Sequence, residues 1–170
     1  DVKSCVVRTL PLLSAIAAGT AVVTLIATPA FSAPSPAASD SHRIPAGRTA
    51  IGDSVMEGAA PNLRRRGFSV DTSVSRQVSA GVAAMRAKRS HGALRRQVVV
   101  HLGTNGTFSS GQCKAMRKVV GKHRNLVLLT VKAPRQWTAG NNRVINRCAK
   151  RYSNVYVLDC LQRRLSFKQR

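Results

Sequence analysis

The most informative stretch of this chain is Ile51-Gly52-Asp53-Ser54-Val55, which follows a short apolar run and precedes a helical pattern. The run before it has the composition of a strand, so Ser54 stands where a strand turns into a helix. A second strand-like run, at 97–102, ends in a loop that offers the carboxamide of Asn105. A serine hydroxyl and an asparagine amide at neighbouring strand ends are half of an acyl-transfer site.

Strand-like and helical patterns alternate along the chain from residue 48 onwards. The predicted strands are 48–51, 68–72, 97–102, 126–131 and 155–158. Five strands alternating with helical segments predict an α/β fold with a parallel sheet covered by helices on both faces. Ligands of such sheets bind outside the carboxyl ends of the strands. We therefore expect four segments at one edge, namely 53–54, 76–77, 103–106 and 132–137.

The helix after the first strand has a start signal of its own. Ser54 and Glu57 stand in the S-x-x-E relation of a capping box, and Gly67 follows three arginines as a stop. Ser54 therefore has two interpretations, a helix cap and a nucleophile, and the local pattern does not separate them.

Charge is the unusual feature of the composition. There are 28 Lys and Arg against 6 Asp and Glu, which gives a formal net charge of +22, and no acidic side chain lies between Asp71 and Asp159. Such a surface attracts polyanions, and an anionic envelope polymer is one candidate partner. Specific nucleic-acid binding is not expected, because aromatic residues make up only 4% of the chain and no stacking platform is present.

The amino-terminal part has the pattern of a targeting segment. Residues 10–30 are dominated by Leu, Ile, Val and Ala, and Lys3 and Arg8 precede them. Residues 1–32 are interpreted as a signal peptide or a membrane anchor, and residues 33–47, rich in Pro, Ser and Ala, as a flexible linker. Both interpretations predict that the remainder is exported, either secreted or membrane-anchored on the extracytoplasmic side.

The cysteines match no metal-site spacing, and no metal is expected. In an exported protein Cys113 and Cys148, on two predicted helices, can form a disulfide. The alternative is a pair of buried thiols.

With these residues in place, the chain resembles the SGNH, or GDSL-type, hydrolase superfamily. Gly52-Asp53-Ser54-Val55 is similar to the first block of the family, and Gly103-Thr104-Asn105-Gly106 to the third. Together with Val131-Lys132-Ala133-Pro134-Arg135-Gln136-Trp137, these blocks resemble the extracytoplasmic SGNH domain of acyltransferases that O-acetylate peptidoglycan and other envelope polysaccharides. The resemblance covers about residues 49–159.

The resemblance implies a three-layer flavodoxin-like fold, a domain at 48–159 and serine-based acyl chemistry without a cofactor. Ser54 is implied as the nucleophile, Asn105 as an oxyanion-hole donor and Gly103 as part of the third-block loop, while Asp53 orders the turn. The second block of the family, which supplies a glycine N–H to the oxyanion, aligns near Arg76, with Gly81 a few residues later. Arg76, Gln77 and Trp137 are candidate substrate-binding residues; the alternative for Trp137 is a place in the core.

The chain departs from the family at its carboxyl end. The family has an Asp-x-x-His block that activates the serine, and no such block occurs here; the histidines are His42, His91, His101 and His123. His101 lies inside a strand run and is expected to be packed. Residues 160–170 match nothing in the family, and we interpret them as a non-homologous basic tail after a truncated domain.

Two functional hypotheses follow from the sequence. The first is an SGNH-type serine esterase or O-acyltransferase domain that acts on acyl esters of envelope carbohydrate or on small esters, impaired by the missing histidine block. The second is a non-catalytic basic envelope module that binds anionic polymer.

Overall fold

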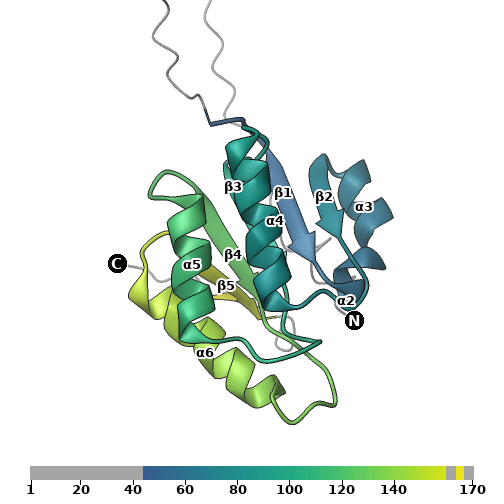
Figure 1. Cartoon of the computed structure of the whole chain (residues 1–170), viewed down its shortest axis with the longest axis vertical. Coiled ribbons are helices and arrows are strands. Elements are labelled where there is room, and N and C mark those ends of the chain that lie inside the picture. The colour runs from purple at the N-terminus through teal and green to yellow at the C-terminus, as the bar shows by residue number, and fades with distance from the viewer. Residues whose placement is uncertain (1–43, 160–163, 167–170) are drawn as a thin grey trace, which may run out of the picture.

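The computed structural model describes residues 44–159 and 164–166. Strands and helices alternate along this part of the chain (Figure 1). In chain order the elements are β1 (Arg48–Gly52), α2 (Ser54–Glu57), α3 (Ala60–Arg65), β2 (Phe68–Thr72), α4 (Val78–Ser90), β3 (Gln97–His101), α5 (Ser110–Val120), β4 (Asn125–Leu129), α6 (Thr138–Arg151), β5 (Val155–Asp159) and β6 (Arg164–Ser166).

The strands form one sheet in the order β2-β1-β3-β4-β5-β6, and the first five are mutually parallel. The predicted parallel α/β sheet is therefore confirmed, with each of its five strands within two residues of its expected bounds. In register, Gly52 lies opposite Thr72 on one side and His101 on the other. This pairing brings the carboxyl ends of β1, β2 and β3 to one edge.

The sixth strand was not predicted. β6 pairs antiparallel with β5, with Leu165 opposite Leu158 and Arg164 opposite Asp159. Residues 164–166 lie in the segment that we interpreted as a tail outside the domain, so at least these three residues extend the sheet. Three residues among basic neighbours are too short for an alternating pattern, which is why the sequence did not reveal them.

Helices cover both faces of the sheet. In Figure 1 helices α4, α5 and α6 lie in front of the strands. Their apolar side chains pack with one face of the sheet in a cluster that includes Ile51, Met85, Val100, Met116 and Ile145, all at most 1% exposed. A second, smaller cluster forms where α2 and α3 meet the other face, and it includes Ala50, Met56, Leu63, Phe68 and Val99.

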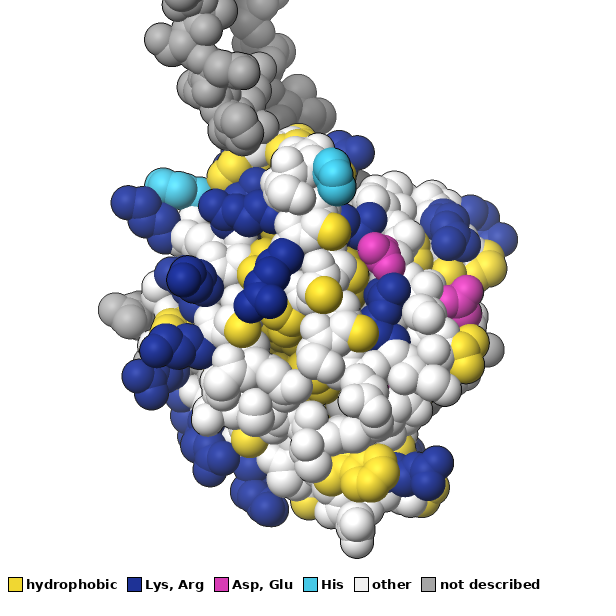
Figure 2. Space-filling model, viewed as in Figure 1, with side chains coloured by type: hydrophobic (Ala, Val, Ile, Leu, Met, Phe, Trp, Pro, Cys, Tyr) yellow, Lys and Arg dark blue, Asp and Glu magenta, His cyan; other side chains and the backbone are white. Residues whose placement is uncertain are grey.

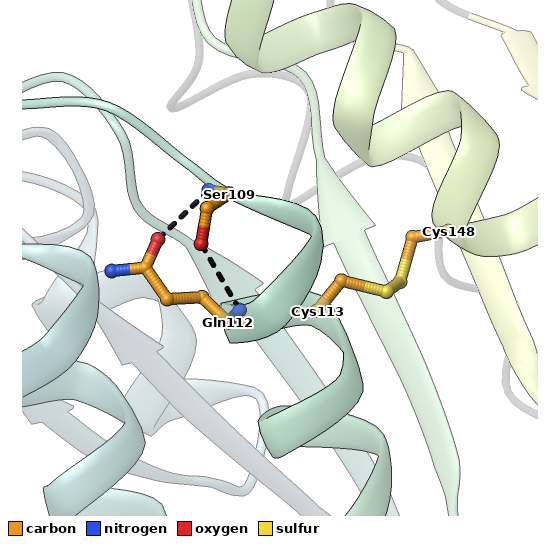
Figure 3. The surroundings of a disulfide bond; sticks show 4 residues. All are labelled: Ser109, Gln112, Cys113 and Cys148. Atoms are coloured by element: carbon orange, nitrogen blue, oxygen red, sulfur yellow. Dashed lines mark hydrogen bonds between the residues drawn. A yellow bond between two sulfur atoms is a disulfide. The ribbon is translucent and has the colours of Figure 1, made fainter.

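A disulfide joins α5 to α6 (Figure 3). Cys113 and Cys148 are bonded across a sequence separation of 35, with their Cα atoms 6.1 Å apart. The structure thus decides between the two alternatives in favour of the bond. One turn earlier, Ser109 and Gln112 form a reciprocal capping box that starts α5, with Gln112 N–H donating to Ser109 Oγ at 3.2 Å.

Residues 1–32, for which we predicted a signal peptide or membrane anchor, lie outside the described residues, as does most of the predicted linker. Within 44–159 and 164–166, no helix combines the length and the apolar character that a bilayer crossing requires.

Candidate active site

Ser54 is the first residue of α2, and its side chain is exposed. The helix is capped by Asp53, whose Oδ1 accepts a hydrogen bond from the Val55 N–H at 3.1 Å. The predicted capping box of Ser54 with Glu57 is therefore wrong. Asp53 has the extended backbone of a cap residue and a carboxylate that satisfies an otherwise unpaired N–H of the first turn. Capping by Asp53 leaves the Ser54 hydroxyl free at the start of the helix.

Gly52 allows the strand to turn into the helix at close range. A Cβ atom placed on Gly52 would lie 2.3 Å from the Met56 Cβ, a separation that real side chains do not adopt. Met56 is the buried residue of α2 and is fully enclosed, so its side chain has no room to withdraw. The glycine is thus what lets α2 begin directly at the end of β1 and hold Ser54 at the sheet edge.

Asp53 and His101 form a buried pair beneath Ser54. His101 Nδ1 lies 3.2 Å from Asp53 Oδ1, and the two side chains are 1% and 0% exposed. Burial by itself raises the pKa of the Asp53 carboxyl, but the hydrogen bond and charge of His101, with smaller contributions from Thr104 and the Val55 N–H, outweigh it and hold that pKa below its usual value. His101 is thus packed, as expected of a histidine inside a strand run.

Helix α6 holds the loop after β3 in place through side-chain hydrogen bonds. Asn141 is 2% exposed, and its Nδ2 donates to the carbonyl oxygens of Gly103 at 2.9 Å and Gly106 at 2.8 Å. Its Oδ1 accepts from the Phe108 N–H at 2.7 Å. The Gly103 carbonyl also accepts from the indole N–H of Trp137 at 3.1 Å. The Asn141 side chain thereby binds three residues of the loop.

Gly103 meets two requirements that favour glycine. Its φ of +113° lies in the region that L side chains rarely adopt, and a Cβ atom there would lie 3.0 Å from Asn141 Nδ2. The close approach is what allows the Asn141 amide to reach the loop.

Asn105 lies within this fixed loop. Its Nδ2 is buried and has no hydrogen-bond partner among the described residues. Because Gly52 and His101 are paired in the sheet, and Thr104 acts on the Asp53 carboxyl, the loop with Asn105 lies beside the turn with Ser54. An unsatisfied buried amide costs free energy unless a ligand accepts from it. The Asn105 amide is therefore available to donate a hydrogen bond to a ligand oxygen at this edge of the sheet.

Of the candidate residues after the second strand, Arg76 is bound within the protein and Gln77 is exposed. Arg76 donates to the carbonyl and to Oδ1 of Asp71, the latter at 2.7 Å, and its side chain is 12% exposed. Gln77 is the exposed cap residue of α4. Gly81, considered as the second-block donor, uses its N–H within the helix, donating to the Gln77 carbonyl at 3.1 Å, and packs against Leu102.

Two site residues were missed by sequence reasoning, Asn141 and its neighbour Asn142. Asn142 accepts from the Val131 N–H and donates to the Val131 carbonyl, which fixes the segment after β4. Asparagine is a poor helix former, because its side chain competes for backbone groups. Two adjacent asparagines in a helix near the predicted site edge were the available signal. No group of three metal-ligating side chains occurs within the described ranges.

Comparison with known proteins gives a consistent set of relatives, although no protein-family model matches the chain. OatA, an O-acetyltransferase of Staphylococcus aureus, is 30% identical over 112 residues, which cover 64% of this chain. YrhL of Bacillus subtilis, a candidate peptidoglycan O-acetyltransferase, is 31% identical over 112 residues, or 65% of this chain. In each case the match spans 18% of the relative's length.

Solved structures show the same fold. The C-terminal catalytic domain of the peptidoglycan O-acetyltransferase OatA of Streptococcus pneumoniae, solved with a methylsulfonyl adduct, superposes with a TM-score of 0.62 at 20% identity over 70% of this chain and 72% of that one. A GDSL-like lipase of Bacteroides thetaiotaomicron gives a TM-score of 0.51 at 14% identity, covering 71% of each chain.

The fold is thus the one shared by the OatA catalytic domain and a GDSL-like lipase, which agrees with the resemblance to the SGNH, or GDSL-type, hydrolases. Its sequence is similar to a segment that makes up 18% of the O-acetyltransferase OatA and of YrhL.

Proposed function

We propose that the described domain performs serine acyl chemistry at the edge formed by β1 and β3, as an esterase or O-acyltransferase acting on acyl esters of envelope carbohydrate. Ser54 is the nucleophile in this proposal. Support comes from the free hydroxyl at the start of α2, from the unpartnered amide of Asn105 in the neighbouring loop, and from the similarity to O-acetyltransferases.

The proposed reaction passes through an acyl-serine. Ser54 Oγ attacks the ester carbonyl, and the carbonyl oxygen becomes an oxyanion that accepts from Asn105 Nδ2 and from the Ser54 N–H. No described residue accepts from that N–H. One such donor contributes roughly 3 to 4 kcal/mol to transition-state stabilisation. Collapse expels the alcohol and leaves the acyl group on Ser54, and water or a sugar hydroxyl then takes it over.

The reaction also needs a base for the Ser54 proton, and no described histidine is placed to act as one. His101 uses Nδ1 for Asp53, and its Nε2 is buried with no hydrogen-bond partner in the described part of the chain. His91 lies at the far end of α4, against the Ala87 carbonyl. His123 lies just before β4, at the amino ends of the strands, whereas Ser54 lies at their carboxyl ends. We therefore propose that the chain turns over slowly, with the oxyanion donors supplying a residual acceleration on the order of a thousandfold or more over water.

We propose an extracytoplasmic location for the domain. The Cys113–Cys148 bond supports it, because disulfides persist in oxidising compartments and are rare in reducing ones. Export through residues 1–32, as a signal peptide or an anchor, belongs to the same proposal.

The observation that carries the proposal is the buried, unpartnered Asn105 amide beside a serine that its own helix does not use. Hydrolysis of p-nitrophenyl acetate by wild type and Ser54→Ala tests it. Ser110→Ala is the matched control, since Ser110 is likewise an exposed first residue of a helix whose cap precedes it. Loss of activity in Ser54→Ala alone supports the proposal, and equal rates in all three proteins contradict it.

A further inference from the structure

A groove between α5 and α6 leads away from the candidate site. It consists of two adjoining hollows of about 380 and 370 Å³ that share Val144 and Arg147. The first is lined by Thr107, Phe108 and Trp137, next to the loop that holds Asn105. The second continues past the Cys113–Cys148 bond to Arg151 and Tyr152.

Arginines recur along this groove at the helical repeat. Arg143, Arg147 and Arg151 are exposed and stand four residues apart on α6, so their backbone positions rise by about 6 Å from one to the next. Lys114 adds a cation from α5. In Figure 2 basic side chains gather on the side of the molecule where α5 and α6 lie, and the acidic side chains visible in this view lie on the other side.

Within residues 44–159 and 164–166, no salt bridge gives these cations an acidic partner. The salt bridges among the described residues join Asp71 to Arg76 and Lys88, and Asp53 to His101. None reaches α5 or α6. At the far end of the groove, the guanidinium groups of Arg117 and Arg151 each lie 5.8 Å from the Tyr152 ring centre, which limits their freedom before any ligand binds.

We propose that the α5–α6 groove binds a linear polyphosphodiester, a flexible chain whose phosphates repeat along its length and which carries no bases. Three arginines in a row, without an acidic partner among the described residues and on backbone positions that rise by about 6 Å each, suit regularly spaced phosphates better than a single small anion. A nucleic acid fits less well, because the three aromatic rings of the groove are poorly placed for base stacking. Phe108 is buried, Arg135 lies over the Trp137 ring, and two arginines lie over Tyr152. The proposal does not depend on chemistry at Ser54.

Fluorescence anisotropy of end-labelled poly(glycerol phosphate), titrated with the full chain, tests the proposal. The groove variant is Arg143→Gln, Arg147→Gln and Arg151→Gln together. The matched control is Arg64→Gln, Arg65→Gln and Arg66→Gln together. It removes the same charge from exposed residues that directly precede β2, the outermost strand on one side of the sheet. Circular dichroism verifies that both variants are folded.

We expect the groove variant to raise the Kd at least about tenfold and to reduce the slope of log Kd against log salt by about two to three, since each phosphate contact contributes somewhat less than one. The control is expected to change the Kd less than about threefold, because long-range attraction alone is lost. Ser54→Ala should bind as wild type does, which separates this result from that of the proposed catalysis.

Acrylamide quenching of Trp137, the single tryptophan of the chain, locates the polymer. Bound polymer should shield Trp137 in wild type and in the control. Equal losses of affinity in the groove variant and the control, unchanged quenching on binding, or tighter binding of a single-stranded oligonucleotide of the same phosphate number would each overturn the proposal.

Discussion

The side-chain amide of Asn141, in the first turn of α6, donates to the carbonyl oxygen of Gly103, in the loop after β3, at 2.9 Å. The two residues are 38 positions apart, and the same amide also donates to Gly106. Through this contact α6 determines where the loop with Asn105 lies relative to α2.

Replacing Asn141 should therefore damage both stability and activity. In Asn141→Ala the Gly106 carbonyl and the Phe108 N–H lose their partner, and a buried unsatisfied group costs about 1 to 3 kcal/mol. Urea unfolding should show a loss of at least about 2 kcal/mol, and ester hydrolysis should fall with it. Asn146→Ala is the control, an exposed asparagine of the same helix whose loss should change stability by less than about 0.5 kcal/mol. Equal losses of stability and activity in the two variants would contradict the role of Asn141 in positioning the loop.

The Asp53 carboxyl should make the fold sensitive to acid. Its pKa is lowered in the folded state, so its ionised form stabilises the fold above the unfolded pKa of about 3.9, and this stabilisation is lost as the pH falls through the folded value. Asp53→Asn keeps a good cap residue but removes the charge. The difference in unfolding free energy between wild type and Asp53→Asn should be largest near pH 6 and shrink towards pH 3.

Asp71 shifts in the same direction, because the hydrogen bond and charge of Arg76, followed by Lys88, outweigh the effect of its burial and lower its pKa. Some acid sensitivity should therefore persist in Asp53→Asn. If the unfolding free energy of wild type exceeds that of Asp53→Asn by the same amount at every pH, the assignment of this acid sensitivity to Asp53 is contradicted.

The disulfide should contribute measurably to stability. A bond that closes a loop of about 35 residues is worth roughly 3 to 4 kcal/mol through the entropy of the unfolded chain. Cys113→Ser with Cys148→Ser should lower the free energy of unfolding by about that amount. Dithiothreitol should lower wild type to the same level and leave the double variant unchanged. A variant as stable as oxidised wild type would contradict the prediction.

Gly52 should tolerate no side chain. In Gly52→Ala the new Cβ meets Met56, and α2 must shift, so we expect a loss of about 1 to 3 kcal/mol together with reduced esterase activity. Gly111→Ala is the control, because the nearest atom to its Cβ would be Ser109 Oγ at 3.7 Å, an ordinary contact, within a helix that alanine favours. Similar losses in both variants would show that the close approach to Met56 is not the cause.

The sheet was predictable because its signals are local. Val98, Val99 and Val100 form a continuous β-branched run that is buried on both faces, as the strands of a parallel sheet are. Ile145 and Cys148 stand three residues apart, the spacing of one helix face, and both are buried on α6. These assignments needed only the period of the apolar residues.

The site was less predictable because its details depend on distant contacts. The S-x-x-E pattern leaves Ser54 as either the cap of α2 or a nucleophile. The structure has Asp53 as the cap, and Asp53 is held there by its buried contact with His101 of the neighbouring strand β3. Asn141 reaches Gly103 only because the fold brings the first turn of α6 beside the loop after β3. No window of local sequence contains either contact.

The most direct test of the account is the rate at which one acetyl group from p-nitrophenyl acetate appears on the peptide that contains Ser54, measured by mass spectrometry in wild type and in Asn105→Ala. Loss of the Asn105 donor should slow this acetylation about a hundredfold or more while leaving acetylation of surface lysines unchanged. An equal rate in both proteins, or label on lysines but never on Ser54, would contradict the claim that the Ser54 hydroxyl and the Asn105 amide act on the same carbonyl.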